Sequence, residues 1–246
     1  MTQEDNDRGD KAVSETVGFI LLFGVVVIGM SFIYVTGYPI LQSNMDSSIF
    51  QGAEQSFIVM QSDMKMVSFD QTPVKNMNLK LHSAGMWIDS TPFMDITYNG
   101  TSTHYPIGKI EYMKGERSLA YENGAVMAQY DTGSKIMLSD PRIYSTIIGG
   151  DDITTIGIVQ VNGNGGSSGS SVITLKMEHN DTVLTRTDIP VNVSLKMNSD
   201  YAYVWRDYFE DIGFATSPVI NETYFEAYKN DTFLIIGHNI VDTRIT

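Results

Sequence analysis

A long segment without charge near the start of the chain limits what this sequence can fold into more than any other feature. The 30 residues from Thr16 to Met45 contain no Asp, Glu, Lys, Arg or His. A helix needs about 20 predominantly apolar residues to cross the hydrocarbon core of a bilayer. We therefore expect residues 13–41 to form a transmembrane helix, and the chain to cross the cell membrane once.

The positive charges around this segment predict its orientation. Arg8 and Lys11 come just before it, whereas the next cation is Lys65. Lys and Arg are retained on the cytoplasmic side of a span, and acidic residues contribute little to this rule. A secretory signal would have a shorter apolar region followed by a cleavage site of small residues, and no such site follows here. We expect a cytoplasmic N-terminus and an extracellular C-terminal domain.

The junction before the span carries a recognisable motif, since residues 11–18 read Lys-Ala-Val-Ser-Glu-Thr-Val-Gly. It resembles the class III signal peptide of archaeal type IV pilins and their relatives, where a charged and a small residue precede the cut and a hydrophobic residue and a Ser follow it. Many of those proteins have Ser-Pro where this chain has Ser14-Glu15. The Ser-Glu form, with Gly18-Phe19 and residues 34–37, resembles an uncharacterised archaeal group of pilin-like membrane proteins, and the similarity extends into residues 108–126.

This resemblance implies that a prepilin peptidase cuts between Ala12 and Val13, with Lys11 before the cut and residues 1–12 as the leader. Cleavage one residue earlier and an uncleaved anchor both remain open. Glu15 would be third in the mature chain and would neutralise the free α-amino group of its own or a neighbouring subunit; alternatively it lies at the water interface beside Lys11. The implied partners are the membrane, the peptidase, other pilin subunits and the assembly platform.

The segment after the span has a helical period. Gly37 and Pro39 fall where the hydrophobic run ends, and a kink or break is expected there because Pro removes a backbone hydrogen bond. In residues 42–68 an amphipathic helix is predicted, because apolar residues recur at steps of three and four. These residues are Met45, Ile49, Ala53, Phe57, Met60, Met64 and Val67. The apolar stripe is expected to pack on the chain's own β domain, with a helix–helix seam in a filament as the alternative.

Residues 69–246 show the alternation typical of half-buried strands. Met77, Leu79 and Leu81 alternate with polar residues, and Asn-Gly pairs at 99–100 and 123–124 suit tight hairpin turns. The Gly/Ser tract of residues 162–170 is expected to be a mobile loop or linker, and Asn230-Asp231 to be a hinge between two strands. Ser199 is expected to cap a short helix. The predicted class is α+β, with a long hydrophobic helix followed by an extracellular, mostly antiparallel β domain such as a β-sandwich.

Composition argues against several classes of function. The chain has no cysteine, which excludes disulfides, zinc thiolate sites and thiol catalysis. Its net charge of −13 makes nucleic acid an unfavourable partner. The four histidines are scattered, Asp151-Asp152 lacks the pattern of a calcium loop, and the Gly-x-Ser-x-Gly match at residues 165–169 lies in the Gly/Ser tract. We expect no enzyme activity, no cofactor and no metal.

Five Asn-x-Ser/Thr acceptors follow the span, on the side expected to be external. They are Asn99, Asn180, Asn192, Asn221 and Asn230. Asn99 and Asn230 fall at predicted turns and are the best candidates for N-glycosylation, whereas Asn192 lies within a predicted strand.

Together these features predict an archaeal pilin-like cell-surface protein, a minor pilin or pseudopilin of a type IV pilus-like filament. A monomeric membrane-anchored binding or adhesion module is the alternative. An ectoenzyme is the third possibility.

Overall fold

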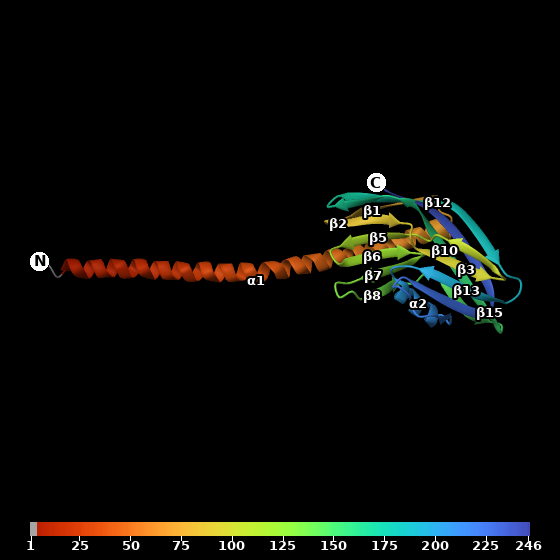
Figure 1. Ribbon diagram of the computed structural model, residues 1–246. Helices are drawn as coiled ribbons and strands as arrows, with labels where there is room; N and C mark the ends of the chain where they lie inside the picture. Colours follow the sequence, from red (N-terminus) through yellow and green to blue (C-terminus); the bar gives the residue numbers. More distant parts are fainter. Residues whose placement is uncertain (1–3) are drawn as a thin grey trace. The chain divides into compact units, whose positions relative to one another are not determined.

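The computed structural model describes residues 4–246, with side chains from residue 17 onward (Figure 1). The chain forms two compact units, Met1–Gln51 and Gly52–Thr246. The first helix, α1 (Glu4–Ser68), contributes to both units. Each unit is described by itself.

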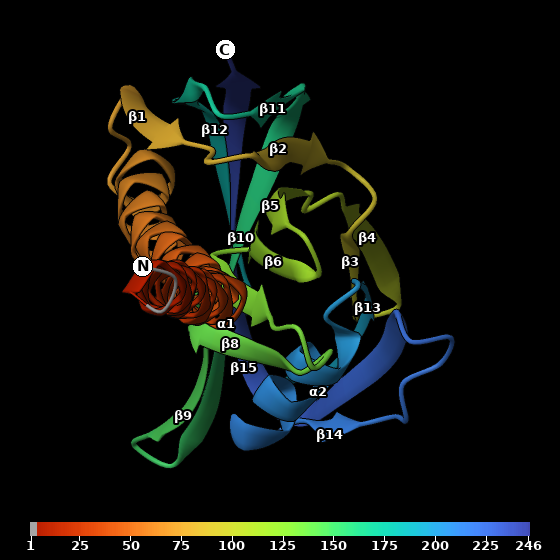
Figure 2. The same ribbon diagram turned by 90° about the vertical axis from the view of Figure 1, so that its left-hand side faces the viewer.

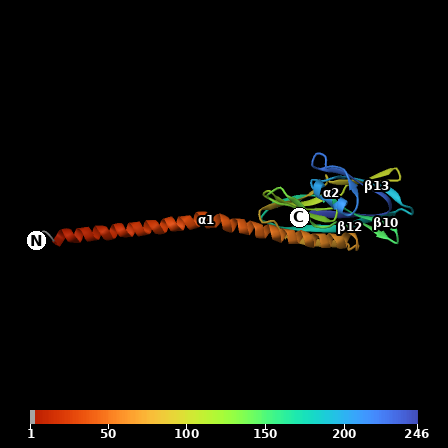
Figure 3. The same ribbon diagram turned by 90° about the horizontal axis from the view of Figure 1, so that it is seen from below.

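In the first unit, α1 is apolar and open to its surroundings. Its large side chains from Val17 to Leu41 are exposed, with Ile28 at 70%. It is the single described helix that is long and apolar enough to cross a membrane, which is compatible with a single-pass anchor. The expected break at Pro39 is wrong, because α1 continues through this residue, and the expected kink stays a prediction. Figure 3 shows α1 as one unbroken helix. A proline inside a helix costs about 3 kcal/mol, which the rest of a helix of 65 residues can absorb.

In the second unit, the last part of α1 packs on the β domain with one face. Ala53, Phe57, Met60, Met64 and Val67 are all buried, so the predicted packing is confirmed for these five residues of the stripe. It is wrong for Met45, which is 60% exposed, and Ile49 is half-buried. The ring of Phe57 meets that of Tyr112 edge-on, with centroids 6.3 Å apart.

The smaller sheet has six strands in the order β11-β2-β5-β6-β7-β8. Its strands are β2 (Ala84–Asp89), β5 (Lys109–Lys114), β6 (Arg117–Glu122), β7 (Ala125–Gln129), β8 (Lys135–Ser139) and β11 (Gly166–Gly169). The predicted antiparallel meander of β5, β6 and β7 is confirmed. Asn123 and Gly124 form the β6–β7 turn with φ of 46° and 83°, as their sequence predicted.

The larger sheet has nine strands around the 22-residue β15 (Tyr224–Ile245). The others are β1 (Val74–Lys80), β3 (Phe93–Tyr98), β4 (Thr101–Tyr105), β9 (Ile143–Ile148), β10 (Asp151–Asn164), β12 (Val172–Arg186), β13 (Val191–Asn198) and β14 (Ala215–Thr216). The pairs are antiparallel except that β10 runs parallel to β15. Hairpin signals report only strands that are neighbours in the sequence, so this pair was not predicted. Figure 2 shows β10 and β15 side by side, with the β9 hairpin extending from them.

The expected hinge at Asn230-Asp231 is instead a bulge within β15. Asp231 has a φ of 54°, and the register with β13 shifts between Val191 and Val193 at this point. Before the bulge β15 pairs with β13 and β14, and after it with β10 and β12. A single long strand therefore turns from one set of partners to another.

The Gly/Ser tract is part of both sheets, so the expectation of a mobile loop is wrong. β10 extends to Asn164, and β11 pairs with β2. A Cβ at Gly163 would lie 2.1 Å from the carbonyl oxygen of Thr243, and one at Gly166 would lie 2.9 Å from the Cβ of Trp87. Glycine permits these close backbone approaches.

The core draws residues from both sheets and from α2 (Ala202–Asp211). Ala202, Trp205 and Phe209 of α2 are buried, as predicted. Ser199 does not cap α2: the N-cap position is Tyr201, and the Ser199 hydroxyl accepts a hydrogen bond from the backbone N–H of Tyr201 at 3.0 Å. The α+β fold class is confirmed, with a long apolar helix followed by a β domain of two mainly antiparallel sheets.

Candidate functional site

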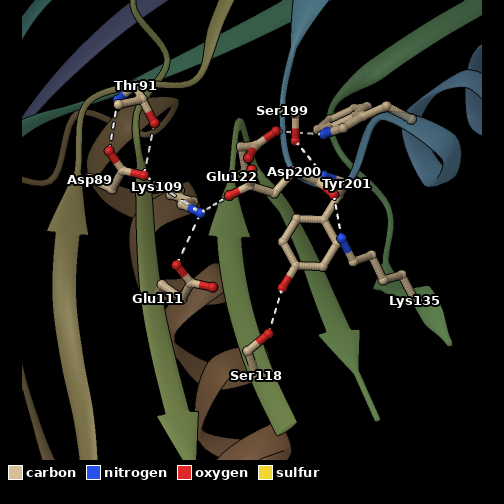
Figure 4. Close-up of polar contacts among 11 residues, drawn as sticks. Asp89, Thr91, Lys109, Glu111, Ser118, Glu122, Lys135, Ser199, Asp200 and Tyr201 are labelled. Carbon is tan, nitrogen blue, oxygen red and sulfur yellow. Dashed lines mark hydrogen bonds and ion pairs between the residues drawn. The ribbon is translucent and has the colours of Figure 1, made fainter. Parts of the chain in front are cut away.

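A buried lysine stands at the centre of the most unusual group of side chains in the β domain (Figure 4). Lys109 lies on β5, between Asp89 of β2 and Glu122 of β6 in the sheet register. Only 2% of its side chain is exposed, and its Nζ lies 2.5 Å from Asp200, 3.0 Å from Glu111 and 3.6 Å from Asp89. We call Lys109 with these carboxylates and Glu122 the Lys109 cluster.

The groups around Lys109 determine the pKa of its ammonium group. Burial alone would lower the pKa of Lys109, but the hydrogen bond from its ammonium to Asp200 and the charge of Glu111 outweigh it and raise the pKa above its ordinary value. The ammonium group therefore stays charged at neutral pH. It can hold carboxylates in place, but it does not supply the neutral amine that nucleophilic catalysis requires.

Glu122 is the opposite case within the same cluster. Its side chain is fully buried, and burial raises the pKa of its carboxyl to about 7, against the hydrogen bonds from Ser199 and Trp205 and the charge of Lys109. The Oε1 atom accepts a hydrogen bond from the indole of Trp205 at 2.7 Å. Its Oε2 has no hydrogen-bond partner among the described residues. An unpaired buried acceptor favours the protonated form.

The cluster opens into a hollow of about 420 Å³, which we call the polar pocket. Its lining is Glu111, Met113, Gly115, Glu116, Ser118, Gln129, Tyr130, Asp131, Gly133, Lys135, Asp200 and Tyr201. The hydroxyls of Ser118 and Tyr201 are 3.0 Å apart on its inner wall (Figure 4). Lys135 donates a hydrogen bond to the Asp200 carbonyl at 2.7 Å and stands over the Tyr201 ring.

Two further hollows lie in the same unit. A groove of about 310 Å³ beside the last turns of α1 carries the cations Lys65 and Arg142. A third hollow of about 300 Å³ near the end of β15 is lined by Asp242 and Arg244 among other polar residues. Neither contains a buried ionic cluster like that of Lys109.

The described residues contain no assembled metal site. From Val17 onward, no group of three or more His, Asp or Glu side chains is placed to hold an ion. His104 pairs with Asp95 at 2.6 Å, and His238 with Gln160 at 2.9 Å. Asp152, considered above for cation binding, pairs instead with Lys229 at 3.0 Å.

The Gly-x-Ser-x-Gly match lies on strand β11. That strand pairs at its full length with β2. A hydrolase elbow needs a sharp turn from a strand into a helix. The match does not have this context.

The processing motif is not accessible to structural description. Lys11, Ala12, Val13 and Glu15 have side chains outside the described residues. The predicted cleavage position and the role of Glu15 remain predictions.

The five glycosylation candidates are dispersed over the β domain and differ in their surroundings. Asn99 is exposed in the β3–β4 turn with a φ of 49°. Asn221 is also exposed in a turn, whereas Asn180 donates to Asp242 at 2.8 Å. Asn192 accepts a hydrogen bond at 3.1 Å from the backbone N–H of residue 231. Asn230 is exposed, but its acceptor-motif threonine is fully buried.

Sequence reasoning missed the Lys109 cluster. A signal was present, because Lys109, Glu111 and Glu122 stand directly beside large apolar residues in β5 and β6. Charged residues are almost never fully buried unless they are paired. Their partner Asp200 is 91 positions from Lys109 in the sequence, and nothing local connects the two.

Comparison with known proteins places the chain in a family. An uncharacterized protein of Archaeoglobus fulgidus is 21% identical over 228 residues, covering 82% of each chain. A second uncharacterized protein of this archaeon is 28% identical over 105 residues, covering 41% of this chain and 34% of its own. No solved structure matches. The model of a family of unknown function matches residues 11–229, and the protein therefore belongs to that family, DUF7289.

Proposed function

We propose that this protein is a pilin-like cell-surface protein, anchored by α1 with its N-terminus in the cytoplasm and its β domain outside. One observation carries the proposal. The single helix α1 exposes apolar side chains through residues 17–41 and buries an apolar stripe through residues 53–67 on its own β domain. A helix of this kind can be held by a bilayer at one end and carry a folded domain at the other.

A second feature of α1 supports assembly with further copies. Within the second unit, the face away from the buried stripe carries five exposed, uncharged residues at alternating steps of three and four. They are Gly52, Gln55, Val59, Ser62 and Met66. Four of the five, all but Gln55, are apolar or small, and such residues at this spacing are typical of helix–helix seams. We infer that this seam receives α1 of another copy.

The same spacing continues back along the helix. It reaches Val17 through Ser48, Met45, Leu41, Tyr38, Tyr34, Ser31, Val27, Gly24 and Ile20, without a charged residue. A charge in this line would be expensive in a bilayer or in the interior of a filament. In this proposal the protein is a minor pilin or pseudopilin, trimmed by a prepilin peptidase before Val13.

The test is to determine the N-terminus of the protein by peptide mass spectrometry. The material is taken from membranes and from sheared surface filaments of its native cells. A start at Val13 and recovery in the filaments are expected. A start at Met1 or Thr2, with all material in membranes, would overturn the proposal.

A matched pair of variants tests the seam. Val59→Glu places a charge on the exposed seam and is expected to abolish recovery in filaments, because an unpaired carboxylate must then be buried between helices. Asn76→Glu adds the same charge at an exposed position of β1 and is expected to leave recovery unchanged. Equal recovery of both variants would argue against the seam.

The polar pocket favours a second candidate function, a monomeric membrane-anchored binding module. A hollow of about 420 Å³ with a buried ionic wall is not required for assembly through α1. Full processing with no filament material, together with ligand binding in membranes, would favour this candidate.

A further inference from the structure

We propose that the polar pocket binds a neutral polyhydroxylated ligand, such as a sugar unit of a glycan. The inference goes beyond the proposed function and rests on the pocket alone. It holds whether the protein assembles into filaments or remains a monomer in the membrane.

The charges around the polar pocket nearly cancel, although the whole chain is strongly acidic. Of the four carboxylates that line it, Glu111 and Asp200 contact Lys109. Asp131 pairs with Arg117 at 2.5 Å, which lowers the pKa of Asp131. Glu116 has no cation in the described ion pairs, and Lys135 adds one further positive charge. The four carboxylates therefore face three cations, Lys109, Arg117 and Lys135, and one negative charge is left. Such a pocket selects neither for a cation nor for an anion, which favours a neutral ligand.

The groups inside the pocket both donate and accept hydrogen bonds. Ser118 and Tyr201 share one hydrogen bond, and each hydroxyl keeps further capacity. The Gln129 side chain lies at the end of β7 and makes no hydrogen bond to the described residues, so its amide offers both a donor and an acceptor. Sugar hydroxyls also donate and accept at the same atom. The hydrogen-bonding groups of the pocket are therefore complementary to the hydroxyl groups of a sugar.

The walls of the pocket are held in place before any ligand arrives. Lys109 fixes the carboxylates of Glu111 and Asp200, and Lys135 fixes the backbone at Asp200. Tyr201 is 1% exposed and its position is set by the hydroxyl of Ser118 and the ammonium of Lys135. A preorganised site loses less entropy on binding. A volume of about 420 Å³ also lies within the range of small-molecule sites.

The experiment is saturation-transfer NMR on the full chain in phospholipid nanodiscs, which avoids sugar-based detergents. The probes are the methyl glycosides of glucose, galactose and mannose, N-acetylglucosamine, maltose and lactose. Glucuronic acid and glucosamine serve as anionic and cationic comparison ligands. We expect transfer to at least one neutral sugar and a weaker signal for its charged relative.

Variants assign the binding to the pocket. Gln129→Ala and Ser118→Ala are each expected to raise the Kd of the bound sugar about tenfold, because one hydrogen bond is lost. Asn76→Ala, exposed on β1 in the other sheet, is expected to leave the Kd unchanged. An unchanged Trp emission spectrum checks that each variant is folded.

Three results would overturn the inference. They are the absence of transfer to every neutral sugar, a stronger response to a charged sugar, and an unchanged Kd in both pocket variants. None of these results bears on N-terminal processing or filament recovery, so the failure of this inference and that of the proposed function are distinguishable.

Discussion

Trp205 donates its indole N–H to the carboxyl of Glu122 at 2.7 Å, and this hydrogen bond joins α2 to the end of β6 inside the domain. Both side chains are fully buried. The bond satisfies one oxygen of Glu122 and leaves the other without a partner among the described residues. The contact between the small sheet and α2 thus depends on a group whose charge can change near neutral pH.

This group makes the stability of the β domain depend on pH. The carboxyl of Glu122 has a pKa of about 7 in the folded state and an ordinary value of 4.5. Between these values the folded state binds more protons than the unfolded state, so the contribution of Glu122 to stability is fully present below about pH 4.5 and is lost as pH rises to about 7. The shift corresponds to about 3 kcal/mol.

Glu122→Gln tests this dependence. The amide keeps the acceptor for Trp205 and cannot ionise, so the fall in stability between pH 4.5 and 7 is expected to flatten. Guanidinium unfolding of the full chain in nanodiscs, followed by Trp emission at several pH values, measures it. The same slope in the variant and the parent would assign the pH dependence to other groups.

Replacement of Lys109 is expected to be among the most damaging substitutions in the β domain. Lys109→Met removes the ammonium that contacts Asp89, Glu111 and Asp200. Breaking a buried ion pair from one side costs about 3–5 kcal/mol, because the remaining charges stay desolvated. Partial exposure of Asp200, at 57%, places the expected loss at the lower end, about 3 kcal/mol.

Lys80→Met is the matched control for this substitution. Lys80 is exposed on β1, and its replacement is expected to change the free energy of unfolding by about 0.5 kcal/mol or less. The shift in Tm of the two variants measures the difference. Similar Tm values would mean that the Lys109 cluster contributes little to stability.

The elements that could be predicted from the sequence are those fixed by local patterns. The uncharged stretch and the stripe through Phe57 and Met64 specify α1, and Asn123-Gly124 specifies a hairpin, because each signal lies within a few neighbouring residues. The helix continues through Pro39, and the sequence did not predict this. The prediction considered only the local cost of the proline and not the length of the helix on either side of it.

The elements that could not be predicted depend on residues far apart in the sequence. The parallel register of β10 and β15 pairs Ile153 with Phe233. The Lys109 cluster joins β5 to the segment before α2 in the same way. A single sequence carries no local signal for such pairs. The composition of the Gly/Ser tract even pointed to the opposite conclusion, because glycine serves both flexible linkers and close backbone contacts.

The close contact at Gly163 can be tested directly. Gly163→Ala would place a Cβ 2.1 Å from the carbonyl oxygen of Thr243, so the strands must separate. Overpacking of this kind costs about 1–3 kcal/mol, and protease cleavage within residues 162–170 is expected to become faster. Gly237→Ala is the control, because the nearest atom to its new Cβ is 4.0 Å away. Equal cleavage rates in both variants would contradict the close β10–β15 contact at Gly163.

The structure also ranks the glycosylation candidates. Asn99 lies in an exposed turn, and the hydroxyl-bearing Thr101 of its motif is exposed as well. For Asn230 the motif residue Thr232 is fully buried, and its hydroxyl donates to Asp152 at 2.8 Å. We therefore expect a transferase that acts on the folded chain to glycosylate Asn99 and to leave Asn230 unglycosylated.

Glycopeptide mass spectrometry of the native protein checks this ranking. Asn99→Gln should remove one glycan mass and Asn230→Gln none, and a glycan found on Asn230 would mean that modification precedes folding of β15.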